Sequence, residues 1–243
     1  MRTDVANKIR NTLFLGLASS VVVFIYLDHQ VRISWSAALI RKFGNPDAAR
    51  EAFLAEFLLA SMSVFVCAGV GFFLARRYRL PGMGDIRELR RFVPWLILAG
   101  LSASPVAYFL HDRVFLVGAR EKGCVEMIPG GIGWSLVFVA YGVLFKEVIF
   151  RFGLMTLISG LFRGRRPWLA VGGITVFAAG LSLRELGFAG HMPENNLITL
   201  SVFIWALIFN AALGAACVKK GLWGAMALRI CVDLRFVLYA VLG

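Results

Sequence analysis

Three charged residues stand close together inside a long apolar stretch, Gly131–Gly160, and they are the first candidates for chemistry. They are Lys146, Glu147 and Arg151. A charge at bilayer depth costs at least about 2.5–3.5 kcal/mol on insertion scales, so each must face a polar interior or a partner. Glu147 and Arg151 are four residues apart and share one helix face, so we expect them to pair. Lys146 points about 100° away from Glu147 and needs a partner from another helix.

A second group of charges lies in the last apolar stretch of the chain. Arg229 and Asp233 are four residues apart and share a face, whereas Arg235 lies off that face. We expect Lys146 and Arg229 to pair with Glu147 and Asp233, and Lys146 to lie near Asp233. Intramembrane ionisable residues mark functional sites by default, but buried ion pairs also hold helices in register. The sequence leaves both interpretations open.

The composition places these charges in a polytopic membrane protein. Of 243 residues, 59% are hydrophobic and 16% are charged, and the mean hydropathy is +0.77, whereas soluble domains are roughly 25% charged. These values exclude a soluble enzyme, a disordered regulator and a secreted disulfide scaffold. A helix needs about 20 apolar residues to cross a bilayer. We therefore expect an all-α transmembrane bundle of about seven spans, at about 11–27, 52–75, 92–110, 131–160, 167–183, 197–218 and 222–242.

The distribution of basic residues predicts the orientation of the chain. The formal net charge is +12, but the basic residues lie mainly in short loops, which indicates topology and not a nucleic-acid site. The N-terminal segment and the even-numbered loops hold 14 Lys and Arg residues, and the other loops hold 8. The positive-inside rule therefore predicts a cytoplasmic N-terminus and a C-terminus outside.

Two segments between spans have patterns of their own in the N-terminal two-span region, 1–91, which precedes the helical core, 92–243. Ile33–Phe43 has the pattern of an amphipathic segment on the membrane surface, with Trp35 at the interface. Arg76–Arg91 is a basic loop, for which contact with anionic lipid and docking of a partner both remain open.

Neither the cysteines nor the histidines indicate a metal or a cofactor. The four cysteines lack CxxC spacing, and three of them lie in apolar runs, which is typical of small core residues. The sequence contains no HExxH motif and no His or Cys pair at ligand spacing. His29 and His111 lie at the ends of spans and His191 lies in a loop, so we expect interfacial or solvated side chains.

Three motifs in order give residues 92–242 a resemblance to a known family. Lys146–Arg151 (Lys-Glu-Val-Ile-Phe-Arg) resembles the Glu-Glu-x-x-x-Arg motif of the CAAX-protease and bacteriocin-processing membrane family (CPBP, also called Abi). Phe177–Leu181, about 30 residues downstream, stands where that family has Phe-x-x-x-His. Arg229–Asp233 stands where it has His-x-x-x-Asn or His-x-x-x-Asp.

The resemblance implies glutamate-dependent intramembrane proteolysis, in which a carboxylate and an imidazole activate water and a second His steadies the oxyanion. Lys146 replaces the first Glu of that site, Leu181 replaces the first His, and Arg229 replaces the second His. Three positions keep the family's residue types: Glu147, Arg151 and Asp233. We therefore expect no catalytic residue, no cofactor and no metal at this degenerate site.

The sequence thus predicts a non-catalytic member of this family in a bacterial inner membrane. Its expected role is that of a scaffold, assembly factor or accessory subunit that binds another integral membrane protein or a lipid. The alternative is an active intramembrane endopeptidase of the CAAX-processing type with an altered site, which would use Glu147 with His191. A small-solute transporter is a third class, and it would need paired discontinuous helices in repeated halves.

Overall fold

The computed structural model describes residues 2–30, 46–112, 131–188 and 196–242. It is 92% helical, and no strand occurs in those ranges, which confirms the predicted all-α class. The elements in chain order are α1 (Arg2–Gln30), α3 (Pro46–Leu74), a 3-10 turn (Arg76–Tyr78), α4 (Ile86–Ala107) with a π-helical end (Tyr108–Asp112), α6 (Ile132–Ala140), two π-helical stretches (Tyr141–Lys146 and Val148–Leu154), α7 (Met155–Leu161), α8 (Pro167–Phe188) and α9 (Asn196–Leu242).

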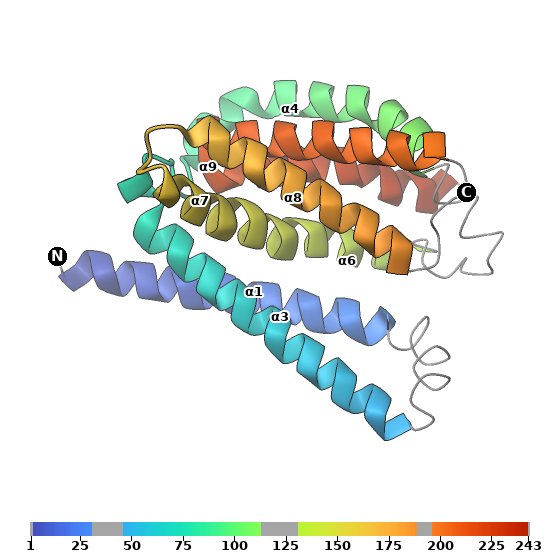
Figure 1. The fold of residues 1–243 in the computed structure, drawn as a ribbon, viewed down its shortest axis with the longest axis horizontal. Coiled ribbons are helices and arrows are strands. Elements are labelled where there is room, and N and C mark those ends of the chain that lie inside the picture. The colour runs from blue at the N-terminus through green and yellow to red at the C-terminus, as the bar shows by residue number, and fades with distance from the viewer. Residues whose placement is uncertain (1, 31–45, 113–130, 189–195, 243) are drawn as a thin grey trace.

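The helices lie side by side along one long axis, with α1 and α3 at one flank and α4 at the opposite flank (Figure 1). The segment from α6 to α7 forms one continuous rod between these flanks. The chain reverses inside α9 at Gly221, whose φ of 75° and ψ of −170° are not helical. The two halves of α9 are therefore separate rods. This agrees with the two separate helical segments, 197–218 and 222–242, that the sequence predicts.

Four helices within the described ranges are long and apolar enough to cross a membrane: Thr3–His29, Arg50–Leu74, Ile132–Leu161 and Thr199–Val241. The last of these contains both rods of α9. Helix α8 has a shorter apolar stretch, Pro167–Ser182, and α4 begins with a charged turn. The structure thus confirms a helical bundle with helices long and apolar enough to span a membrane, and seven separate spans stay a prediction.

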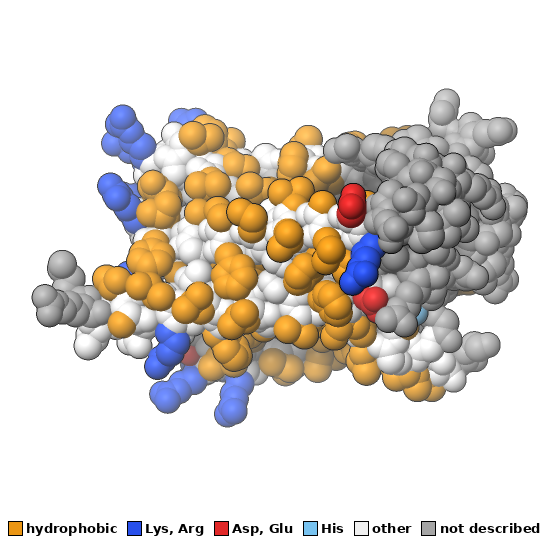
Figure 2. Space-filling view, turned by 90° about the horizontal axis from the view of Figure 1, so that it is seen from below, with side chains coloured by type: hydrophobic (Ala, Val, Ile, Leu, Met, Phe, Trp, Pro, Cys, Tyr) orange, Lys and Arg blue, Asp and Glu red, His pale blue; other side chains and the backbone are white. Residues whose placement is uncertain are grey.

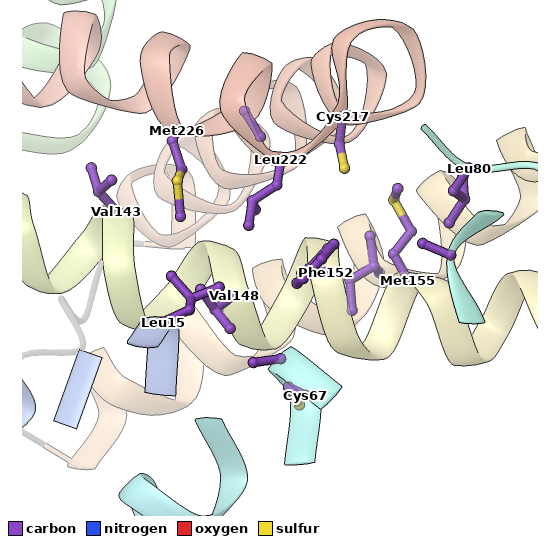
Figure 3. Close-up of a cluster of buried hydrophobic side chains, with 14 of the residues drawn as sticks. Leu15, Cys67, Leu80, Val143, Val148, Phe152, Met155, Cys217, Leu222 and Met226 are labelled. Atoms are coloured by element: carbon purple, nitrogen blue, oxygen red, sulfur yellow. The ribbon is translucent and has the colours of Figure 1, made fainter. Parts of the chain in front are cut away.

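One hydrophobic core joins the N-terminal helices to the rest of the bundle (Figure 3). Leu15 of α1 and Cys67 of α3 pack in the same cluster as Phe152 and as Met226 of α9. Gly71 allows this close packing, because a Cβ atom there would lie 2.3 Å from the ring of Phe152. Small residues permit such close approach between membrane helices. Regions 1–91 and 92–243 therefore share a core.

The face of the molecule in Figure 2 is largely apolar along its described length, and Lys and Arg side chains gather at the end that bears the start of α1. Near this end, Ser159 of α7 donates a hydrogen bond to the carbonyl of Tyr78 (3.2 Å), and the ammonium of Lys8 in α1 lies 5.9 Å from the ring centre of Phe73 in α3. The N-terminus lies at this end, and the C-terminus lies at the other (Figure 1). The segment Ile33–Phe43 falls outside the described residues.

Candidate functional site

Glu147 lies between the two π-helical stretches, in the middle of the α6–α7 rod. Its side chain is 0% exposed. One of its carboxylate oxygens, Oε2, lies 3.4 Å from Nε of Arg151, which is 1% exposed. The predicted pairing of these two residues is confirmed. π-Helical turns inside α-helices occur frequently at functional sites, and these two were not predicted from the sequence.

Arg229 connects Glu147 to the last helix. Its Nη1 donates to Oε1 of Glu147 at 2.9 Å, and its Nε donates to Oδ2 of Asp233 at 3.0 Å. Gly142 makes room for this guanidinium, because a Cβ atom at Gly142 would lie 2.5 Å from Nε of Arg229. The predicted pairing of Arg229 with both acids is therefore confirmed.

Arg235 extends the same chain of charges toward the end of α4. Its Nε and Nη2 donate to the two carboxylate oxygens of Asp112, at 2.7 Å and 3.2 Å. Its Nη1 donates to Oδ1 of Asp233 at 3.2 Å, and the Tyr239 hydroxyl donates to Asp112 at 3.4 Å. The sequence placed Arg235 off the face of Arg229 and Asp233, yet its long side chain reaches back to Asp233.

We call these six residues the ion chain: Arg151, Glu147, Arg229, Asp233, Arg235 and Asp112. Positive and negative groups alternate along it, and its three guanidinium groups balance its three carboxylates. A charge buried in an apolar interior must be paired to be tolerated. The ion chain meets this requirement with residues from α4, the α6–α7 rod and α9.

Arg151 anchors the far end of the ion chain on the first half of α9. Its Nη2 donates to the backbone carbonyl of Asn210 at 3.2 Å and also to the Asn210 side-chain oxygen. The Asn210 amide in turn donates to the carbonyl of Ala206 at 2.7 Å. Among the described residues, Nε and Nη1 of Arg151 and Oε2 of Glu147 make no hydrogen bond. The Arg151–Glu147 contact is therefore electrostatic.

The three sequence motifs meet in space. Phe150 of the first motif lies 6.3 Å from Phe177 of the second, measured between ring centres. Glu147 of the first motif contacts Arg229 of the third. Leu181, which stands at the position of the first His, lies half-buried in α8. The structure thus brings together segments that the sequence resemblance had grouped only by their order.

Lys146 makes an aromatic contact within its own π-helical stretch. Its ammonium is 5.8 Å from the ring centre of Tyr141, a distance typical of a cation–π interaction. The partners that the structure shows for Asp233 are Arg229 and Arg235. The proximity of Lys146 to Asp233 stays a prediction.

Of the three histidines, the structure describes the side chain of His29 and the backbone of His111. The ring of His29 packs on Trp134, with the centroids 3.6 Å apart. His111 belongs to the π-helical end of α4. His191 lies outside the described residues, so the Glu147–His191 pairing is not tested.

Sequence reasoning missed Asp112, Asn210 and Tyr239. Asp112 follows the third apolar run, where an acid is usually solvated, and Asn210 lies within an apolar run as an isolated polar residue. The signal that could have found Asp112 is Arg235, a third intramembrane charge that needed an acid of its own.

The arrangement leaves Glu147 poorly placed for proton transfer. A general base must come within about 2.6–3.2 Å of the proton that it takes, and each oxygen of Glu147 faces a guanidinium group. No group of three or more His, Cys, Asp or Glu side chains with metal-site geometry occurs in the described ranges. Fold and site together define an all-helical membrane protein with a buried, charge-balanced ion chain. Comparison of the chain with protein-family models, curated proteins and solved structures finds no match.

Proposed function

We propose that this protein is a non-catalytic relative of the CPBP family that acts as a scaffold, assembly factor or accessory subunit for another membrane protein or a lipid. The observation that carries the proposal is the state of Glu147. Its side chain is fully buried, and its two oxygens face Arg151 and Arg229. A carboxylate buried between two guanidinium groups in this way serves as a structural ion-pair partner.

The replaced positions support the same conclusion. Arg229, at the position of the family's second His, ties Glu147 to Asp233. Leu181, at the position of the first His, can neither accept a proton nor hold water. The positions that the resemblance assigns to catalysis thus carry ion-pairing and apolar groups, and the cluster links α9 to the α6–α7 rod.

The proposed setting is a bacterial inner membrane, with seven spans and a cytoplasmic N-terminus. The gathering of basic side chains at the end of the bundle that bears the N-terminus supports this orientation (Figure 2), because cytoplasmic loops carry the excess of Lys and Arg. The non-helical Gly221 supports counting α9 as two spans.

A peptidase assay on purified protein in lipid vesicles tests the loss of catalysis. We expect no cleavage of membrane-embedded peptide substrates by the natural protein. Cleavage is expected only after the family residues are restored by Lys146→Glu, Leu181→His and Arg229→His together. The matched control carries Lys146→Glu and Arg229→His but keeps Leu181, so it lacks the first imidazole. Its thermal unfolding shows whether the altered ion chain still folds.

The Glu147→Gln variant separates the two classes of function. If Glu147 has a structural role, the folded variant still binds the partner protein or lipid. The reason is that the glutamine amide oxygen still accepts a hydrogen bond from Arg229 and keeps the helices together. Peptidase activity of the natural protein that Glu147→Gln abolishes would overturn this proposal and establish the endopeptidase alternative.

A further inference from the structure

A cleft of about 640 Å³ opens at the basic end of the bundle. It lies between residues 76–85 of the basic loop, the first turn of α4 (from Ile86) and the start of the second half of α9. Its charged lining consists of Arg76, Asp85 and Glu88, and its apolar lining includes Ile86 and Trp223. Its volume falls within the range of about 300–1,000 Å³ that is typical of small-molecule sites.

Backbone hydrogen bonds hold the walls of this cleft in place. The N–H groups of Leu222 and Trp223 donate to the carbonyls of Gly82 and Met83, at 2.9 Å and 3.1 Å. The basic loop therefore caps the second half of α9. The basic loop and α9 lie so close together that a Cβ atom at Gly84 would be 1.9 Å from the carbonyl oxygen of Lys220. The cleft is thus a fixed feature between two chain segments far apart in sequence.

The charged groups of the cleft retain free binding capacity. Arg76 is exposed, and its guanidinium acts on the Asp4 carboxylate through charge without a salt bridge to a described carboxylate. Asp85 uses Oδ1 to cap α4 by accepting from the N–H of Arg87 at 2.8 Å, which leaves its second oxygen. Glu88 lies 3.5 Å from Lys220 through Oε2, which leaves Oε1.

These groups match a ligand that carries both signs of charge. A guanidinium binds phosphate oxygens with paired hydrogen bonds, and carboxylates accept hydrogen bonds from a primary ammonium group. Trp side chains are enriched where headgroups meet the apolar membrane. We propose that this cleft binds the phosphoethanolamine headgroup of a zwitterionic phospholipid, with the phosphate at Arg76 and the ammonium at Asp85 and Glu88.

The two acids decide the class of headgroup. A purely anionic headgroup would meet both carboxylates, which repel it, and a quaternary ammonium group would offer them no N–H donor. The cleft therefore selects a primary ammonium, although the surrounding loops are strongly basic. This inference rests on the proposed function in placing the basic end at a membrane surface, and it is independent of the lost catalysis.

Native mass spectrometry of the full-length protein in detergent tests the proposal. The protein is mixed with equal amounts of phosphatidylethanolamine, phosphatidylcholine and phosphatidylglycerol that have the same acyl chains. We expect phosphatidylethanolamine to be retained about tenfold more than each of the other lipids. A preference of this size corresponds to one charge-assisted hydrogen bond. Equal retention of the three lipids, or a preference for phosphatidylglycerol, overturns the proposal.

Two variants distinguish recognition in the cleft from general attraction to the basic end. Arg76→Gln should lower retention of phosphatidylethanolamine about tenfold. Glu88→Gln should move the preference toward phosphatidylglycerol, because it removes a carboxylate and releases Lys220. The control is Arg165→Gln, an exposed arginine of the α7–α8 turn outside the cleft lining, and it should leave the preference unchanged. A loss with Arg165→Gln as large as with Arg76→Gln overturns the proposal.

A soluble competitor distinguishes a lipid from a free phosphoethanolamine compound. Glycerophosphoethanolamine at the concentration of the lipid should not displace it, because it lacks the acyl chains that lie along the apolar flank. Equal displacement would assign the cleft to a soluble ligand and overturn the lipid assignment. Peptidase activity, by contrast, would overturn the proposed function without changing these lipid measurements.

Discussion

The guanidinium of Arg229 lies 2.9 Å from the carboxylate of Glu147, although 82 residues separate them in sequence. Arg229 is the member of the ion chain that contacts an acid on the α6–α7 rod and an acid on its own helix. Arg229 therefore helps to set the register of the second half of α9 against this rod.

Replacement of Arg229 by methionine should be among the most destabilising changes in this chain. It leaves Glu147 and Asp233 without their shared cation, and breaking a buried pair costs about 3–5 kcal/mol. Unfolding of the purified variant in detergent micelles measures the loss. The control Arg229→Lys keeps the positive charge and should lose less stability than Arg229→Met. A stability equal to that of the natural protein would show that the ion chain does not hold the helices.

Asp233→Ala should destabilise the protein far more than Lys146→Met. Asp233 accepts from both Arg229 and Arg235, so its removal leaves two buried cations underpaired at a cost of about 3–5 kcal/mol. Lys146→Met removes a cation–π contact with Tyr141 worth about 0.5–1 kcal/mol and leaves the ion pairs of the ion chain in place. The two variants are compared by the same unfolding measurement, and the reverse order would contradict the assignment of roles.

Gly142→Ala tests the space that the Arg229 side chain occupies. The added Cβ would lie 2.5 Å from Nε of Arg229, so the guanidinium must move away from Glu147, and we expect a loss of about 1–3 kcal/mol. Gly172→Ala is the matched control, because a Cβ at that helical position meets no atom within 4 Å. Alanine there should be neutral or stabilising by up to about 1 kcal/mol. Equal effects of the two changes would refute the close contact.

The reversal at Gly221 predicts the topology of the last two rods. Reporter fusions after Arg165 and after Lys219 should report the same side of the membrane, since both positions lie at the basic end of the bundle. A fusion after Gly243 should report the opposite side. If the fusions after Lys219 and Gly243 report one side, the seven-span count is wrong.

The helical elements, and the ion pairs between residues four apart in one helix, could be predicted from the sequence. Apolar runs locate helices directly, and the spacing of Glu147–Arg151 and Arg229–Asp233 places each pair on one face of a helix. The contact between Asp112 and Arg235 could not be found in this way. It depends on how the end of α4 lies against α9, which no local spacing specifies.

The contacts of the basic loop could not be predicted from local spacing either. Its charges and glycines are visible in the sequence, but the hydrogen bonds that join Gly82 and Met83 to α9 link segments about 140 residues apart. The role of Gly142 is equally hidden, because the side chain that needs its space comes from another helix.

The ion chain also constrains how the protein enters the membrane. The second half of α9 carries three charged residues, and inserting them without partners would cost about 7.5–10.5 kcal/mol at about 2.5–3.5 kcal/mol each. Their partners, Asp112 and Glu147, lie earlier in the chain and are synthesised first. We therefore expect membrane entry of the second half of α9 to be coupled to its docking on helices already in place, and a chain that lacks these partners to fail during biogenesis, before the mature fold exists.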